Sequence, residues 1–308
     1  MAASTPTQIT NVDNQKLTTE SRSFWRTALI RLKADRLTMA AVAVLLFIAF
    51  CAVFADPITV NLLGIEDPNK TDILASFEGP SREHLLGTDG LGRDQLARLM
   101  YGGRISLLIG AVGTLCTLFL GIMLGMSAAY FGGRVDDIVI WIINTLGAVP
   151  TLFLLLVVGS LFTLSPIWLS ILLGLLGWPT IARLVRGAVF SLREQEYVLA
   201  SRSIGQTNMV IMLKHIFPNV IPIVTIATMR RVGNLLLLES ALSFVGFGVQ
   251  PPTSSWGSML AKAQQFILIP DGRHLVWAPG MMITITVLCL YILGDGLRDA
   301  MDPRLNEG

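Results

Sequence analysis

The sequence predicts an all-α integral membrane protein with six transmembrane helices. Of the 308 residues, 53% are hydrophobic and only 14% are charged, whereas soluble domains carry about 25% charged residues. A soluble protein of this length needs a charged shell around its core, and this composition does not supply one. Several apolar runs also reach the length of about 20 residues that a helix needs to cross a bilayer.

Six apolar runs are the candidate transmembrane helices. Pro150 lies inside the third run and predicts a kink there, because proline removes a backbone N–H and neighbouring helices tolerate the change. Gly121 and Gly125, in the second run, have the spacing that lets two membrane helices approach closely. The six runs are 37–55, 105–131, 138–162, 166–185, 220–247 and 277–294.

The distribution of Lys and Arg predicts the orientation. Cytoplasmic segments of membrane proteins carry an excess of these residues, and here the alternate segments that include the N-terminus hold most of them. Both termini are therefore expected in the cytoplasm, as an N-terminal tail with an amphipathic interfacial helix (1–36) and a C-terminal tail (299–308). The first apolar run begins too late for a cleavable signal peptide.

The longest external connection covers residues 56–104. Within it, residues 92–101 set aliphatic side chains against Arg, Asp and Gln, which predicts an amphipathic helix on the outer surface before the second run. Thr88 or Asp89 suits the N-cap of that helix, because such side chains accept hydrogen bonds from free backbone N–H groups. A contact with another protein is the alternative role for this stretch.

The connection 192–218 predicts a helical hairpin on the cytoplasmic side. Ser191 and Glu194 have the spacing of a capping box, which starts a helix. Gly205 suits the left-handed residue that ends it, and Thr207 or Asn208 suits the cap of a second short helix before Pro218 opens the fifth run. A projection of this kind indicates partner docking; an ordinary amphipathic loop helix is the alternative.

No pattern for catalysis or metal binding is present in the sequence. None of the five lysines follows a glycine, so the phosphate-binding loop that holds ATP is absent. The hydrolase patterns GxSxG and HExxH are also absent. His84, His215 and His274 are too scattered to share a metal ion. The basic residues form no single stripe, which argues against nucleic-acid binding.

Four phrases in order along the chain resemble one family of membrane proteins. Residues 196–205 (EYVLASRSIG) with 215–219 (HIFPN) closely resemble the "EAA" loop of ABC importer permeases, and most of all the C-type subunit of the dipeptide/oligopeptide/nickel permease family. The strict EAA positions hold Leu199, Ala200 and Ser201, and the acid is Glu196 instead. The other three phrases are 84–89 (HLLGTD) with 92–94 (GRD), 242–248 (LSFVGFG) with 250–252 (QPP) and 255–257 (SWG), and 294–299 (GDGLRD) with 302–304 (DPR).

This resemblance implies a type I ABC importer permease fold, with a permease core at 105–298 and a cytoplasmic EAA coupling hairpin at 192–218. It implies a bacterial inner-membrane complex with a second, B-type permease, two ABC ATPase subunits that bind the ATP and Mg²⁺, and an extracytoplasmic solute-binding protein. The chain itself needs no cofactor and is no enzyme. The residues expected to dock the ATPase are Glu196, Tyr197, Ala200, Ser201, Ile204, Gly205, His215 and Pro218.

Polar residues inside the fifth run are candidates for the translocation pathway: Arg230, Arg231, Asn234 and Glu239. A charge at mid-membrane costs about 2.5–3.5 kcal/mol or more, so it indicates function by default. In a wet pathway, an arginine would meet a peptide carboxylate. The alternatives are a contact between Arg231 and Glu239, which lie about two turns apart, or a fifth helix that begins later. The arginine pair is not part of the family pattern.

The expected function is that of the permease subunit of an ABC importer for di- or oligopeptides. Nickel, glutathione and other small solutes are alternatives within the same class. A stand-alone secondary transporter would show inverted repeats and coupling-ion ligands near the midplane, and a channel would show a filter-like sequence. Neither pattern is present in the sequence.

Overall fold

A computed structural model describes residues 24–65, 67–268 and 272–301, and the regular structure in this part of the chain is entirely helical. Five helices are long and apolar enough to cross a membrane, and a sharply bent pair would make a sixth. This finding confirms the all-α membrane class. The long helices are α2 (Arg36–Val53), α4 (Gln95–Phe131), α7 (Pro166–Leu192), α10 (Phe217–Phe244) and α12 (Arg273–Met301).

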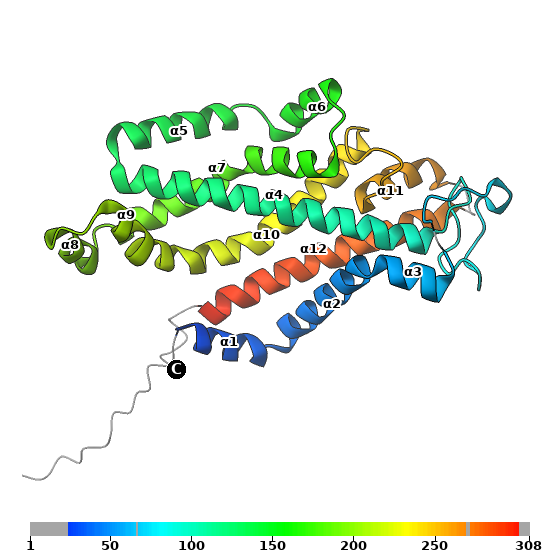
Figure 1. Ribbon diagram of the computed structural model, residues 1–308, viewed down its shortest axis with the longest axis horizontal. Helices are drawn as coiled ribbons and strands as arrows, with labels where there is room; N and C mark the ends of the chain where they lie inside the picture. The colour runs from blue at the N-terminus through cyan, green and yellow to red at the C-terminus, as the bar shows by residue number, and fades with distance from the viewer. Residues whose placement is uncertain (1–23, 66, 269–271, 302–308) are drawn as a thin grey trace, which may run out of the picture.

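The long helices run side by side, and the short elements gather at the two ends of the bundle (Figure 1). One end carries α1 (Phe24–Ala34), the C-terminal end of α12 and the hairpin of α8 and α9. The other end carries α3 (Ala55–Leu63), α11 (Trp256–Ala263) and the loop before α4. Helix α1, the C-terminal end of α12 and the hairpin therefore share one end of the bundle, and the orientation of that end in the membrane stays a prediction.

Small residues let α4 and α7 pack closely, as Gly121 and Gly125 predicted. A Cβ atom at Gly121 would lie 2.7 Å from the Ile181 Cβ, and one at Gly125 would lie 2.6 Å from the Ala182 carbonyl oxygen. Real Cβ atoms do not approach so closely, so the two helices touch because these positions lack a side chain.

A matched pair of glycines on α7 tests this packing. A Cβ at Gly174 would lie 2.6 Å from the Cys116 Cβ and 2.7 Å from the Gly113 carbonyl oxygen, whereas a Cβ at Gly187 would meet nothing within 4 Å. Overpacking costs about 1–3 kcal/mol, so Gly174→Ala is expected to lower the thermal unfolding temperature of the purified protein. Gly187→Ala is expected to keep or raise it, since alanine favours a helix by about 0.5–1 kcal/mol over glycine. Equal melting temperatures for the two variants would contradict this account of the α4–α7 contact.

The prediction of a separate amphipathic helix at 92–101 is wrong, because residues 95–101 belong to the start of the long helix α4. The helix begins at Gln95, where the Asp94 carboxylate accepts a hydrogen bond from the Ala97 N–H at 2.8 Å, and it continues as α4 to Phe131. Its polar face is buried under α11 and the preceding loop, with Gln95 only 3% exposed. The surface pattern in the sequence therefore reflects burial against polar neighbours.

The N-cap assigned to Thr88 or Asp89 is also wrong. The Thr88 hydroxyl donates to the Ala75 carbonyl and accepts from the Glu78 N–H at 2.9 Å, which ties two parts of the loop together. The Asp89 carboxylate binds the Arg93 guanidinium at 2.6 and 2.8 Å. Both residues stabilise the loop, and the cap belongs to Asp94.

Pro150 breaks the third span, where the sequence predicted a kink. Helix α5 (Gly133–Gly147) and helix α6 (Thr151–Leu161) are bent by 76° relative to each other. Proline removes a backbone donor and disfavours helix in the residue before it, and here the chain leaves the helical path for three residues.

The hairpin begins later than the capping box predicted. Helix α7 continues to Leu192 through the position of Ser191, and α8 (Glu196–Ser203) starts after Gln195. The Ser191–Glu194 capping box is therefore wrong. The end of α8 is as expected, because Gly205 has a left-handed φ of +79°.

The second half of the hairpin has no break before the fifth span. Thr207 precedes α9 (Asn208–Ile211) as predicted, although its side chain makes no capping hydrogen bond. Helix α9, a π turn at Met212–Ile216 and α10 form one helix from Asn208 to Phe244. Pro218 lies within this helix in the first turn of α10, so the expectation that it opens a new helix is wrong.

Helix α1 forms at the position predicted for the interfacial helix. Ala28 is buried and packs with Leu32 against Ala300, Met301 and neighbouring residues of α12. The other side is apolar and exposed, with Leu29 and Ile30 at 56% and 48%. An exposed apolar face beside basic residues suits the boundary of a bilayer.

Candidate functional site

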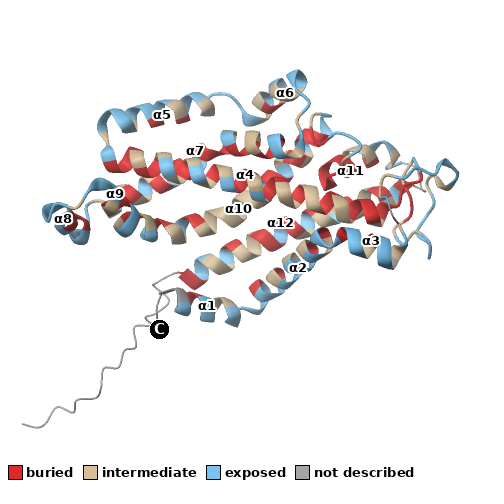
Figure 2. Cartoon of the chain, in the orientation of Figure 1, coloured by how far each residue is buried: buried red, intermediate tan, exposed pale blue. Residues whose placement is uncertain are grey.

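The first candidate site is the hairpin of α8 and α9, which projects beyond the end of the bundle. Figure 2 shows α8 largely in the colour of exposed residues, and α9 in mixed colours. The inner side is anchored by Val198, which is fully buried in one core cluster with Val189, Ile211 and Ile216. The hairpin is therefore tied to both α7 and the helix that follows it.

A polar cluster under α8 fixes the hairpin internally. The Ser201 hydroxyl donates to the Tyr197 carbonyl at 2.8 Å and lies 3.3 Å from His215 Nε2. His215 Nε2 also lies 3.2 Å from the Gln206 Oε1. Ser201 is 7% exposed, so Ser201 and His215 face inward and hold the two arms together. Both were predicted to dock a partner, but the structure places them on the inner side of the hairpin, away from its exposed outer side.

The outer side of the hairpin presents apolar side chains to solvent. Ile204 is 75% exposed and Tyr197 is 42% exposed, and Ala200 lies exposed between them along α8. Glu196, Gly205 and Pro218 are exposed as well. Large exposed apolar groups on a rigid projection are typical of an interaction surface. Further exposed apolar side chains on the hairpin are Leu199, Met209 and Leu213.

The second candidate site is a groove between α7 and α10. Two adjoining hollows of about 720 and 480 Å³ share Thr180, Arg231 and Asn234 in their walls. Arg230, from α10, and Arg298, from the end of α12, also line the larger hollow. Cationic and amide side chains therefore face an open groove along otherwise apolar helices.

The guanidinium of Arg231 packs closely against α7 because position 177 is a glycine. Its Nη2 donates to the Leu173 carbonyl at 3.2 Å, and a Cβ atom at Gly177 would overlap its guanidinium group. Its Nε is buried and has no acceptor among the described residues. The guanidinium thus keeps unsatisfied donor capacity beside the groove.

The neighbouring polar residues of α10 bind α12. Arg230 pairs with Asp295 at 2.6 Å, and both side chains are about half exposed. The Asn234 amide oxygen accepts a hydrogen bond from the Tyr291 hydroxyl at 2.8 Å. These contacts orient one wall of the groove.

Glu239 does not line the groove. It is 1% exposed, and its Oε1 accepts hydrogen bonds from Ser243 at 2.7 Å and Ser255 at 2.6 Å. The predicted alternative of a contact with Arg231 is therefore wrong, because α11 covers Glu239 on another face of α10. The alternative of a later start for the fifth helix is also wrong, since that helix begins at Asn208.

Sequence reasoning missed the groove residues outside the fifth run, among them Gly177, Thr180 and Arg298. The Gly177 position lies just before Trp178 and Pro179 in the fourth run, and that cluster of helix-disfavouring residues was the available signal. The contribution of α12 has no local signal, because it depends on tertiary packing. No group of three or more His, Cys, Asp or Glu residues in the described part of the chain could hold a metal ion.

Comparison with known proteins identifies the family. Residues 121–307 match the family described as "Binding-protein-dependent transport system inner membrane component", and residues 23–80 match the "N-terminal TM domain of oligopeptide transport permease C". The chain is 33% identical to the oligopeptide transport system permease protein OppC of Bacillus subtilis over 298 residues, which cover 96% of this chain and 94% of that protein.

Two other relatives are similar over nearly the whole chain. The oligopeptide transport system permease protein OppC of Haemophilus influenzae is 35% identical, covering 94% of this chain and 92% of that protein. The dipeptide transport system permease protein DppC of Bacillus subtilis is 36% identical, covering 93% of this chain and 88% of that protein. The chain therefore belongs to the family of binding-protein-dependent transport system inner membrane components, as an integral, multi-pass membrane permease.

Proposed function

We propose that this chain is the C-type permease subunit of an ABC importer that takes up di- or oligopeptides. The observation that carries this proposal is that one continuous helix, Asn208–Phe244, holds both part of the exposed hairpin and Arg231 in the groove. Such a helix connects a docking surface directly to a candidate pathway. Relatives named for oligopeptide and dipeptide transport support the choice of peptides.

The hairpin docks one of two ABC ATPase subunits. Tyr197, Ala200 and Ile204 fill a groove on the ATPase, while Ser201 and His215 keep the two arms in register. ATP and Mg²⁺ bind the ATPases, and this chain carries no cofactor of its own. When the ATPases close on ATP, they shift the equilibrium between two conformations of the permease.

The groove is completed by a second, B-type permease. Its open, partly polar wall suits a shared pathway better than a lipid contact, because buried donors need partners. Arg231 is the residue that meets the carboxylate of a passing peptide, since a guanidinium binds carboxylates with two hydrogen bonds. A solute-binding protein delivers the peptide on the extracytoplasmic face, and both termini lie in the cytoplasm of a bacterial cell.

Purification from native membranes tests the assignment. A tagged chain is expected to bring down a second permease and two ATPase chains. In liposomes, that complex should hydrolyse ATP several-fold faster when a peptide-loaded binding protein is added. A complex stimulated by nickel or glutathione, but not by peptides, would contradict the substrate class. A chain that purifies alone and transports solute without ATP would contradict the importer class.

A further inference from the structure

A separate pocket of about 480 Å³ lies at the end of the bundle opposite the hairpin. It is enclosed by the loop before α4, the first turns of α4, α11 with the short helix Gln264–Phe266, and the start of α12. It shares no lining residue with the two hollows that contain Arg231. The pocket is therefore distinct from the candidate pathway.

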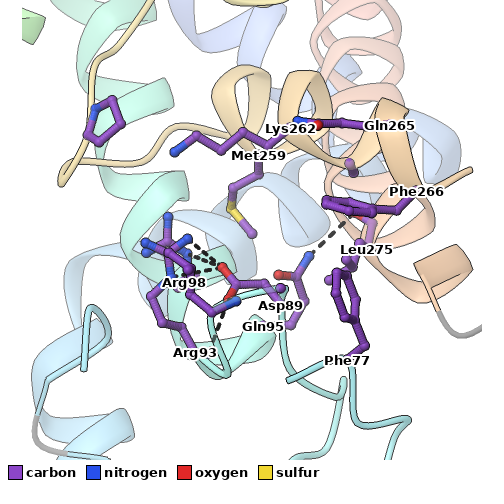
Figure 3. A pocket seen from close by; sticks show the side chains of 14 residues that line it. Phe77, Asp89, Arg93, Gln95, Arg98, Met259, Lys262, Gln265, Phe266 and Leu275 are labelled. Carbon is purple, nitrogen blue, oxygen red and sulfur yellow. Dashed lines mark hydrogen bonds and ion pairs between the residues drawn. The ribbon is translucent and has the colours of Figure 1, made fainter. Parts of the chain in front are cut away.

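One side of the pocket carries an excess of positive charge. Figure 3 shows Arg93, Arg98 and Lys262 on this side, together with the single carboxylate of Asp89. Asp89 is bound in two hydrogen bonds by Arg93 and also lies 3.7 Å from the Nε of Arg98. Arg98 is 2% exposed and donates to the Asn69 amide oxygen at 2.8 Å. The single negative charge of Asp89 is therefore shared by the two positive charges of Arg93 and Arg98.

Lys262 is the unmatched cation of this pocket. It makes no ion pair or side-chain hydrogen bond within residues 24–65, 67–268 and 272–301. Partial burial lowers its pKa, and the nearby charges of Arg98 and Arg93 lower it further, against a smaller opposing effect of the Asp89 carboxylate. A buried charge is costly unless it is paired, so the pocket as it stands favours an added anion beside Lys262.

The opposite side of the pocket is apolar. Phe77 and Phe266 meet edge to face with ring centroids 4.8 Å apart, and Leu275 lies beside them (Figure 3). Small-molecule sites are typically 300–1,000 Å³, mainly apolar, and supplied with a few well-placed polar groups. The volume and the division into a cationic and an aromatic side meet this description.

We propose that this pocket binds a small carboxylic acid that also bears an apolar group. The carboxylate binds between Lys262 and Arg98, and the apolar group lies against Phe77 and Phe266. The occupant is a ligand in addition to the transported solute, because the pocket lies apart from the groove. The inference is independent of the proposed peptide function and holds for any solute that the importer carries.

Equilibrium dialysis of the purified permease complex, without ATP or binding protein, tests the proposal. The probes are N-acetylphenylalanine and its uncharged amide, in detergent with neutral lipid. The acid is expected to bind saturably, with one site per copy of this chain, and at least tenfold more tightly than the amide. Its binding should weaken as salt is added, because ions screen the interaction.

Variants assign the two sides of the pocket. Lys262→Met is expected to weaken binding of the acid at least tenfold and to leave binding of the amide unchanged. Phe266→Ala should weaken binding of both probes by the same factor. Lys70→Met is the control, since Lys70 is exposed on the loop before α4 and does not line the pocket. Because Lys262 has no ion-pair or hydrogen-bond partner among the residues that the structure describes, its removal should keep the thermal unfolding temperature equal or raise it.

Three results would overturn the proposal: no saturable binding of the acid, equal binding of acid and amide, or unchanged binding in Lys262→Met. If the small acid does not bind and Lys262→Met weakens capture of the purified binding protein, the cations serve an acidic side chain of that protein instead. Failure of the binding experiment would leave the importer assignment untouched, because that assignment is tested by co-purification and ATP hydrolysis.

Discussion

Ala200→Asp is expected to reduce co-purification of the ATPase subunits at least tenfold and to abolish coupled ATP hydrolysis. Ala200 lies exposed between Tyr197 and Ile204, so a carboxylate there would be buried without a partner on docking. Leaving a charge unpaired in an interface costs several kcal/mol, and about 1.4 kcal/mol is already a tenfold loss of affinity. The measurement is the ratio of ATPase to permease in pull-downs from membranes.

A matched variant separates docking from general charge effects. Ser191→Asp adds the same charge at an exposed position at the end of α7, outside α8 and α9, and it should leave the complex intact. Gly205→Pro tests the geometry of the hairpin, because proline cannot adopt the φ of +79° and would lose the N–H that donates to the Arg202 carbonyl. Unchanged ATPase binding in both Ala200→Asp and Gly205→Pro would refute the docking role.

Arg231→Gln is expected to lower the rate of peptide uptake at least tenfold while the complex still assembles. The guanidinium is the one groove cation whose buried Nε lacks an acceptor within the described part of the chain, and glutamine keeps a polar, uncharged group on a shorter side chain. The loss should be greatest for peptides with a free C-terminal carboxylate and small for their C-terminal amides. Uptake into reconstituted liposomes with both peptide forms measures this difference.

Two further variants distinguish a role in solute contact from a structural role. Arg231→Lys keeps the charge and should recover part of the uptake, although it loses the bidentate geometry. Gly177→Ala leaves Arg231 in the sequence but places a Cβ where its guanidinium now lies, so uptake should fall as well. Full uptake of free peptides by Arg231→Gln, with normal assembly, would remove Arg231 from the pathway.

Features that depend on local backbone chemistry were predictable from the sequence. Gly205 ends α8 in the left-handed region, and Thr207 precedes the next helix, because turn residues act over a few neighbours. Five of the six predicted spans were also predictable, since crossing a bilayer requires an apolar segment of a set length; the third run instead holds the bent pair α5 and α6.

Features that depend on distant partners were not predictable. The polar face of α4 looked like a water-exposed surface, but Trp256 donates through its indole N–H to the Leu99 carbonyl at 2.9 Å, more than 150 residues away. Glu239 looked like a pathway residue, but it is buried and accepts a hydrogen bond from Ser255, the N-cap of α11. The space for Arg231 is made by Gly177 on a different helix. In each case the deciding contact joins two different helices or their caps, over 16 to 157 residues of sequence, and so depends on tertiary packing.

The unbroken helix Asn208–Phe244 has a mechanical consequence. From Ile211 to Arg231 the rise of an α-helix amounts to about 30 Å, and no proline-induced break or loop interrupts it, although a π turn lies at Met212–Ile216. A continuous helix transmits tilt as well as translation, so a small rotation at the hairpin becomes a larger sideways displacement farther along. The π turn, Pro218 and Pro222 all lie near the hairpin end of this helix, so the stiffness of that stretch would set how much of a movement at the hairpin reaches the groove.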